Sequence, residues 1–166
     1  VQFYVWVLRG TPILLQLYFF WIFLPRATGI KIPDSTCIII ALIVNASSYV
    51  SEIIRAGIQA VDIGQTEAAR SLGMTARNTM TKIILPQAVK NILPALGNEF
   101  ITMIKQASLA SVFFINELTT SYKTVASATF RQVESIIIAG IIYLLVTTIL
   151  GRIMAYAEWR MKQNER

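Results

Sequence analysis

Residues 62–86 read DIGQTEAARSLGMTARNTMTKIILP, and this pattern predicts two short helices joined at a glycine. Asp62 and Gln65 have the spacing of a capping pair at the start of the first helix. Gly73 is placed to take the left-handed position that ends this helix, which glycine adopts without steric cost. Thr75 can then cap a second helix, which runs to the Leu-Pro pair that closes the stretch. We expect a compact elbow that is suited to docking on a partner protein.

The elbow lies within a longer hydrophilic segment, about residues 58–91, that has no apolar stretch long enough to cross a bilayer. Its apolar residues are scattered, and its basic residues outnumber its acidic ones. The basic residues are Arg70, Arg77, Lys82 and Lys90, against Asp62 and Glu67. An excess of Lys and Arg is typical of loops on the cytoplasmic side of a membrane. We therefore expect this segment to be an ordered cytoplasmic loop.

The composition of the whole chain indicates an integral membrane protein. The chain has 166 residues, of which 55% are hydrophobic and only 14% are charged, and its mean hydropathy is +0.58. A soluble domain normally carries about 25% charged residues. The apolar residues also come in long blocks, as they do in membrane-spanning helices. The positive-inside rule explains the net charge of +6 more simply than nucleic-acid binding does.

The apolar blocks predict four membrane spans. The first begins near Gly10, with Pro12 in its first turn and Thr11 as a cap, and it ends at Pro25. The last has a length of about 35 Å at a rise of 1.5 Å per residue, which matches a bilayer. The predicted spans cover about residues 10–25, 35–57, 93–115 and 135–157.

The distribution of Lys and Arg sets the expected topology. The segment 58–91 and the tail after the fourth span are both basic, and two spans separate them, so we expect both on one side. That side is the cytoplasm, which places the C-terminus inside the cell. The connections 25–34 and 116–134, which we predict to be loops, then lie outside, although Arg26 and Lys31 count mildly against this.

Several kinds of chemistry are excluded by the residue types present. The chain has no His, so it has no Ser-His-Asp triad, no Cys-His dyad and no imidazole metal ligand. Cys37 has no second cysteine to pair with, and we expect it to be a small buried apolar residue. The sequence also has no GxxxxGK[ST] phosphate loop. We therefore predict no catalytic residue, metal or cofactor bound by this chain.

The spacing within the elbow resembles the EAA loop of bacterial ABC importer permeases. That loop has the pattern Glu-Ala-Ala, three residues, Gly, nine residues, Ile, one residue and Leu-Pro. Every position is matched here, by Glu67–Ala68–Ala69, Gly73, Ile83 and Leu85–Pro86. A match at every position, with fixed gaps and in a predicted cytoplasmic loop, is a specific signal for this class of permease.

Further segments are similar to permeases of polar amino acid uptake systems of the histidine, glutamine and arginine type. The resemblance covers nearly the whole chain, from about Tyr4 to Arg160. The family's first transmembrane helix has no counterpart here, and the chain begins at Val1 inside an apolar stretch, so we expect an N-terminal part to be missing. One departure is the VWVL run at 5–8, where many relatives carry an acidic residue. The similar segments are 9–17, 47–52, 55–58, 93–101 and 105–109.

The resemblance implies an all-α membrane protein with the type I ABC importer transmembrane fold, formed as a single domain over residues 1–166. It implies that the chain is not itself an enzyme. The chain would work with a second permease copy or homologue, two ATPase subunits that use ATP and Mg²⁺, and an extracytoplasmic amino-acid-binding protein. It would lie in the bacterial cytoplasmic membrane as a multi-pass protein.

The resemblance also assigns the elbow to ATPase coupling, as a pair of helices seated in a groove of each ATPase. Closure of the ATPases on ATP would then swing the spans from inward-facing to outward-facing. Glu67 would anchor the elbow through charge-assisted contacts, Gly73 would allow the turn, and Leu72 and Met74 would be apolar knobs. Packing within the loop is the alternative for each apolar residue. The predicted coupling residues are Glu67, Ala68, Ala69, Leu72, Gly73, Met74 and Pro86.

The third predicted span carries a carboxylate and an ammonium, Glu99 and Lys105, which inside a membrane are functional by default or else paired. They are six residues apart, so they point to different faces and do not pair with each other. We place Asn98 and Glu99 on the translocation path, with Glu99 meeting the ammonium or cationic side chain of a substrate. Alternatively, Glu99 pairs with another span or sits at the cytoplasmic interface. Lys105 is either on the path or a counter-ion, at the dimer interface or to Glu52.

Other polar residues of the spans are weaker candidates for lining the same path. Single polar residues in membrane helices more often bond to neighbouring backbone, which is the alternative for each of them. These candidates are Gln16, Asn45, Ser48 and Tyr49.

Three alternative functions remain beside an importer of polar amino acids. An ABC importer permease for another small solute is the nearest. An ion channel with Glu99 and Lys105 in a selectivity ring leaves the elbow unexplained, and a secondary transporter is disfavoured because the chain shows no internal repeat of broken spans. Within the importer class, Glu99 mildly favours a cationic amino acid, while glutamine, glutamate and cystine stay open.

Overall fold

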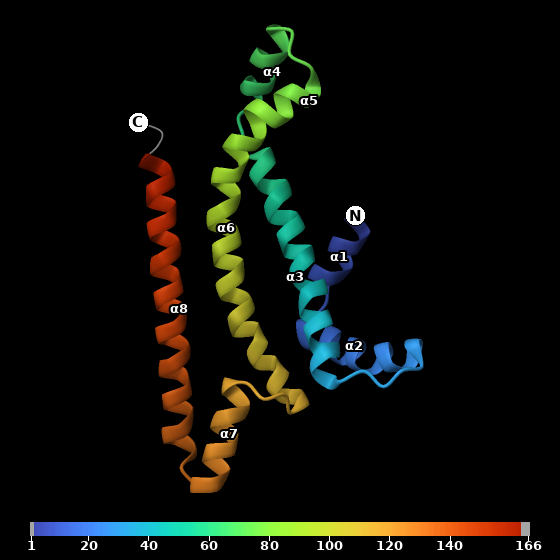
Figure 1. Cartoon of the computed structure of the whole chain (residues 1–166), viewed down its shortest axis with the longest axis vertical. Coiled ribbons are helices and arrows are strands. Elements are labelled where there is room, and N and C mark those ends of the chain that lie inside the picture. Colours follow the sequence, from blue (N-terminus) through green and yellow to red (C-terminus); the bar gives the residue numbers. More distant parts are fainter. Residues whose placement is uncertain (1, 164–166) are drawn as a thin grey trace. The chain divides into compact units, whose positions relative to one another are not determined.

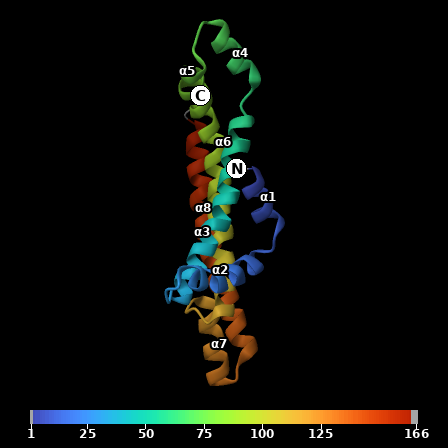
Figure 2. The same ribbon diagram turned by 90° about the vertical axis from the view of Figure 1, so that its right-hand side faces the viewer.

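The computed structural model of the chain describes residues 2–163, apart from the side chain of residue 162, and all the regular elements over that range are helical (Figures 1 and 2). This confirms the prediction of an all-α protein. The elements are α1 (Gln2–Gly10), α2 (Ile13–Thr28), α3 (Asp34–Gln59), α4 (Ile63–Ser71), α5 (Ala76–Thr79), the π-helical turn η1 (Met80–Ile84), α6 (Leu85–Gln106), the 3-10 helix η2 (Ala107–Phe113), α7 (Leu118–Thr129) and α8 (Gln132–Gln163).

The chain divides into two compact units, and three long helices contribute to both. The first unit comprises Val1–Ser48 and Ile101–Leu150, and the second comprises Tyr49–Phe100 and Gly151–Arg166. Helix α3 passes from the first unit to the second, α6 passes from the second to the first, and α8 returns to the second. The elbow lies wholly in the second unit.

The first unit has an apolar core built where α2, α3 and η2 meet. Leu17, Ile38 and Phe113 are nearly inaccessible to solvent and form one cluster with two small alanines. Aromatic rings extend this cluster, with the rings of Tyr18 and Phe113 centred 4.8 Å apart and those of Trp21 and Phe113 5.5 Å apart. These contacts hold η2 against α2 and α3, which lie much earlier in the sequence.

The predicted first span, about residues 10–25, corresponds to the single helix α2. A separate helix, α1, precedes it, and the two are bent by 107° across a short break. The expected cap is wrong, because the Thr11 hydroxyl donates to the Val7 carbonyl (2.9 Å) and Pro12 takes the cap position. The expected end at Pro25 is also wrong, since α2 continues to Thr28 and stops at Gly29, whose φ of +68° is left-handed. The loop predicted from Pro25 is correspondingly shorter.

The predicted third span differs in both its start and its end. The helical path runs without a break from α5 through η1 into α6, so the second elbow helix does not stop before Pro86. Leu85 donates its N–H to the Met80 carbonyl, five residues back, and this widened turn lies directly before Pro86. A proline clashes with the carbonyl four residues back and has no N–H, so a wider turn accommodates it. At the other end α6 stops at Gln106 and continues as the tighter helix η2.

The connection predicted as a loop over 116–134 contains helix α7. Glu117 caps this helix, because its carboxylate accepts from the backbone N–H groups of Thr119 (2.7 Å) and Thr120 (2.6 Å). Two potential donors of the helix start are thereby satisfied, which lets a short polar segment become helical. The last helix, α8, extends beyond the predicted span 135–157 at both ends.

Two of the described helices, α3 and α8, are long and apolar enough to cross a membrane, and the bent pair α1–α2 passes the same test when taken as one span. Helix α6 is not among them, since polar and charged residues interrupt its apolar sequence. The predicted count of four spans therefore stays a prediction.

Candidate functional site

The first helix of the elbow, α4, begins at the predicted cap. The Asp62 carboxylate accepts from the backbone N–H of Gly64 (2.6 Å), which confirms Asp62 as the N-cap. Gln65 has a different partner from the one its spacing predicted, since its side-chain oxygen accepts from the side-chain amide of Gln87 on α6 (3.4 Å). The Gln87 amide also donates to the Ile83 carbonyl (2.9 Å), so Gln65 links α4 to the helix that leaves the elbow.

Gly73 ends α4 in the left-handed conformation that the sequence predicts, with φ of +81°. The Gly73 N–H donates to the Arg70 carbonyl (3.0 Å) and the Met74 N–H donates to the Ala69 carbonyl (3.1 Å). This pair of bonds is a Schellman motif, which satisfies carbonyls that the end of a helix leaves open. A Cβ at Gly73 would meet no atom within 4 Å, so the requirement for glycine comes from the backbone conformation alone.

The second helix of the elbow starts at Thr75, whose hydroxyl accepts from the Asn78 N–H (3.3 Å), as predicted for a cap. Helices α4 and α5 and the turn η1 pack against one another. The residues buried in this packing include Ala69, Thr79 and Ile84. Ala69 therefore faces into the elbow, where its small side chain allows the two helices to come close.

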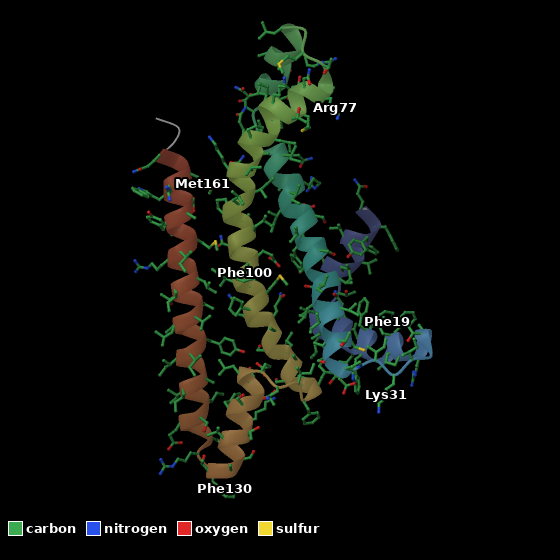
Figure 3. The ribbon with its side chains drawn as sticks, viewed as in Figure 1. Phe19, Lys31, Arg77, Phe100, Phe130 and Met161 are labelled. Carbon is green, nitrogen blue, oxygen red and sulfur yellow. The ribbon has the colours of Figure 1, made fainter. Side chains whose placement is uncertain are left out.

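None of the remaining predicted coupling residues is buried. The apolar side chain of Leu72 is 85% exposed, whereas that of Met74 is half-buried. Glu67 forms no hydrogen bond or ion pair with any other described residue, and Arg77 lies on α5 at the same end of the unit (Figure 3). The other exposed members are Ala68, Gly73 and Pro86.

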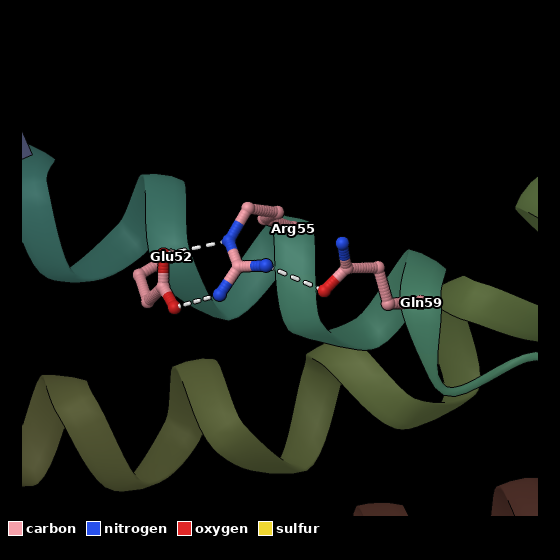
Figure 4. A network of polar contacts seen from close by, with 3 residues as sticks. All are labelled: Glu52, Arg55 and Gln59. Atoms are coloured by element: carbon pink, nitrogen blue, oxygen red, sulfur yellow. Dashed lines mark hydrogen bonds and ion pairs between the residues drawn. The ribbon is translucent and has the colours of Figure 1, made fainter. Parts of the chain in front are cut away.

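Helix α3 carries an ion pair just before it enters the elbow. Arg55 donates from Nε to Glu52 (2.9 Å) and pairs with the same carboxylate through Nη2, while its Nη1 donates to the Gln59 side chain (2.5 Å) (Figure 4). The guanidinium thus bridges two turns of one helix. The pair neutralises charges that would be costly if they faced lipid singly.

In the first unit, three of the predicted path residues bond to one another or to backbone. The Gln16 amide donates to the carbonyl of Leu8 (2.7 Å) and to the hydroxyl of Thr11 (2.8 Å). The Asn45 amide donates to the Gln16 side-chain oxygen (2.9 Å), and the Ser48 hydroxyl donates to the Asn45 carbonyl (2.7 Å). These bonds tie the bend between α1 and α2 to α3, and they favour the structural alternative for this group.

Replacing Asn45 with alanine is therefore expected to lower stability rather than to change substrate preference. Losing one partner of a buried hydrogen bond costs about 1–3 kcal/mol. Thermal unfolding of Asn45→Ala, Gln16→Ala and the double variant should show a non-additive loss, because the two side chains share one bond. A changed substrate preference at unchanged stability would place Asn45 on the path instead.

In the second unit, Glu99 lies on α6 with one carboxylate oxygen, Oε1, buried and without a hydrogen-bond partner in the described part of the chain. Asn98 beside it is exposed. Lys105 lies in the first unit and is exposed, and neither Glu99 nor Lys105 forms an ion pair among residues 2–163. The structure thus leaves a buried carboxylate oxygen on α6 for which this part of the chain supplies no donor.

The sequence did not suggest the contact between α7 and α8 in the first unit. The Tyr143 hydroxyl donates to Glu117 (3.2 Å) and also lies 3.2 Å from the Thr119 hydroxyl. Glu117 is thus both a helix cap and the acceptor for a tyrosine of the next helix. A carboxylate within hydrogen-bonding reach of the backbone N–H groups two and three residues on is the local signal for the cap, whereas nothing local indicates Tyr143.

Comparisons with known proteins agree on one family. The profile described as binding-protein-dependent transport system inner membrane component matches residues 1–163. The arginine transport system permease protein ArtQ of Bacillus subtilis is 41% identical, over 99% of this chain and 75% of the relative. The nopaline transport system permease protein NocM of Agrobacterium fabrum is 39% identical, over 98% and 71%. The glutamine transport system permease protein GlnP of Escherichia coli is 34% identical, over 96% and 73%.

Solved structures support the same fold. A crystal structure of an amino acid ABC transporter with histidines is 47% identical to this chain, with a TM-score of 0.90 over 96% of this chain and 74% of the other. The methionine ABC transporter MetNI, in an inward-facing conformation, is only 19% identical, with a TM-score of 0.70 over 96% and 71%. The second match shows likeness of fold alone.

Proposed function

The chain belongs to the family of binding-protein-dependent transport system inner membrane components, and we propose that it takes up polar amino acids as the permease subunit of an ABC importer. It is an amino acid ABC permease with the type I fold and lies in a membrane. The observation that carries the proposal is the elbow, in which a fixed motif forms two capped helices around one left-handed glycine.

The elbow is the ATPase-coupling element of this permease. Its helices are held by caps and by a buried face, while Leu72 and Glu67 are left exposed without partners in the described chain. An exposed apolar side chain and an unpaired carboxylate on one elbow suit a partner surface that offers an apolar pocket and a basic residue. ATP is hydrolysed by the partner subunits, and the elbow of this chain binds them and transmits their movement to the membrane helices.

The remaining partners and the orientation follow from the same assignment. The elbow and the C-terminus face the cytoplasm, in accord with the basic excess of the elbow. A second permease copy or homologue completes the pathway, and an external binding protein delivers the amino acid. The chain supplies one transmembrane domain of this assembly.

The function is tested by uptake. The permease, co-purified with its ATPase and binding protein and reconstituted in lipid vesicles, should accumulate one or a few labelled amino acids only when ATP is present. Vesicles that lack the ATPase are the control and should show no accumulation. ATP-independent flux of inorganic ions with no amino acid uptake would favour a channel and would contradict the proposal.

Glu99 is the substrate-path residue with the clearest physical support. A carboxylate in a membrane helix with a buried, unpartnered oxygen favours contact with a cation, and the cationic side chain of a basic amino acid supplies one. Glu99→Gln removes the charge and keeps the shape, so uptake of cationic amino acids should fall about tenfold or more while glutamine uptake changes less. Uptake of each amino acid at a series of concentrations measures this, with Glu134→Gln as an exposed control. Equal loss for all amino acids would make Glu99 structural.

A further inference from the structure

The helices that precede and follow the elbow in the chain, α3 and α6, contact each other close to it. Helix α3 enters the elbow and α6 leaves it, and in the second unit they run side by side (Figure 1). Gly57, near the end of α3, faces Ile92 of α6. A Cβ at Gly57 would lie 2.2 Å from Ile92 Cγ1, 3.2 Å from Cδ1 and 3.4 Å from Cβ. The backbone of α3 therefore rests on the Ile92 side chain with no space between them.

The Ile92 side chain has little freedom to yield to such a Cβ. It is 8% exposed, and as a β-branched residue it strongly prefers one χ1 rotamer in a helix. The other glycines of the long helices α6 and α8 differ. Gly97 faces Met154 of α8, whose Sδ would lie 2.7 Å from a Cβ at Gly97, but a flexible thioether can move aside. Gly140 and Gly151 would meet no atom within 4 Å.

A second contact joins the first elbow helix to α6. The Gln65–Gln87 hydrogen bond joins α4 to α6, five residues before Ile92. With this bond and the Gly57–Ile92 contact, both α4 and α3 are held to α6. A displacement of the elbow then reaches α3 and α6 together, because both helices connect directly to the elbow and pack closely against each other at Gly57 and Ile92.

We propose that Gly57 is a positioning residue that seats α3 on Ile92, so that α3 and α6 receive movement of the elbow as one body. The proposal rests on the assignment of the elbow to ATPase coupling. Gly57 acts through its contact with Ile92. Its contribution is the absence of a side chain, since any larger residue would push α3 away from α6.

The test is a reciprocal rescue between the two residues. Gly57→Ala separates the helices, Ile92→Ala leaves a gap between them, and in the double variant the added methyl group occupies part of the space that the isoleucine leaves. We expect each single variant to lower the amount of amino acid transported per ATP hydrolysed by about fivefold or more, and the double variant to restore much of it. Gly151→Ala, where a Cβ meets no atom, is the matched control and should transport as the parent does.

Each result of this experiment decides the proposal. The assay uses the permease with its ATPase and binding protein in lipid vesicles, and it records the yield of assembled complex separately from transport per ATP. A lower yield with an unchanged ratio would make Gly57 merely structural and would overturn the proposal. If Gly57→Ala does not assemble, Ile92→Ala is used alone. An Ile92→Ala complex that transports as much amino acid per ATP as the parent would also overturn the proposal. A parent complex without amino acid transport would instead refute the proposed function.

Discussion

Replacing Gly73 with valine is expected to lower amino acid uptake about fivefold or more, whereas replacing it with asparagine should leave a large part of the uptake. Gly73 has φ of +81° and a Schellman motif around it. An L-residue in this region costs about 1–2 kcal/mol, with a β-branched side chain at a still greater disadvantage, and asparagine is among the few that enter it routinely. A cost of that size lowers the population of the correct elbow by a factor of about 5–30.

The measurement is ATP-dependent uptake together with the amount of ATPase that co-purifies with each variant. Because a Cβ at this position meets no atom, the two substitutions differ in backbone preference rather than in steric clash. Equal activity of Gly73→Val and the parent would show that the elbow works without its left-handed turn. Equal loss in both variants would place the requirement on the small size of glycine at the ATPase surface.

Replacing Leu72 with alanine is expected to weaken binding of the ATPase without weakening the fold of the permease. Leu72 is 85% exposed, so the permease alone gains little from its side chain. Fully burying a leucine contributes about 1.5–3 kcal/mol, which corresponds to a loss of affinity of roughly tenfold or more on truncation. Titration of the ATPase onto the permease in nanodiscs measures this affinity directly.

Phe130→Ala is the matched control for Leu72→Ala. Phe130 is 91% exposed at the end of α7, in a connection that we place on the opposite side of the membrane. Its truncation should leave ATPase affinity unchanged. Lower thermal stability of Leu72→Ala with unchanged ATPase affinity would show that Leu72 packs within the permease instead of docking.

The elbow could be predicted from the sequence in detail because its signals are local. Asp62, Gly73 and Thr75 each act on backbone groups within a few residues, so their roles depend little on the rest of the fold. Gln65 is the exception, since its partner Gln87 is 22 residues away and no local pattern indicates it.

The predicted helix ends that proved wrong lie at prolines, where the outcome depends on how the helix accommodates the proline ring. Pro25 and Pro86 were both expected to end helices, but α2 reaches the left-handed Gly29 and a π-helical turn precedes Pro86. Helix α2 thus passes through Pro25 and ends at Gly29, whereas the π-helical turn accommodates Pro86. The sequence shows where the prolines are, but it does not show that the helices continue past them.

The polar residues of the spans were predicted by residue type, and their partners came only with the structure. Gln16 and Asn45 are bonded to each other across 29 positions of the sequence, whereas Glu99 keeps a buried oxygen without a partner in the described chain. The same reasoning from polarity in a membrane helix selected all three. Only the hydrogen-bond geometry of the structure distinguishes the bonded pair Gln16–Asn45 from Glu99.

The central claim, that the elbow seats in the ATPase, is tested most directly by site-specific crosslinking. Cys37 is the single cysteine and is buried, so a Cys37→Ala background allows one new thiol to be placed at will. A photoreactive maleimide attached after Leu72→Cys should crosslink the permease to the ATPase in native membranes, and the same label after Phe130→Cys should not. A crosslink to the ATPase from position 130 and none from position 72 would contradict the account.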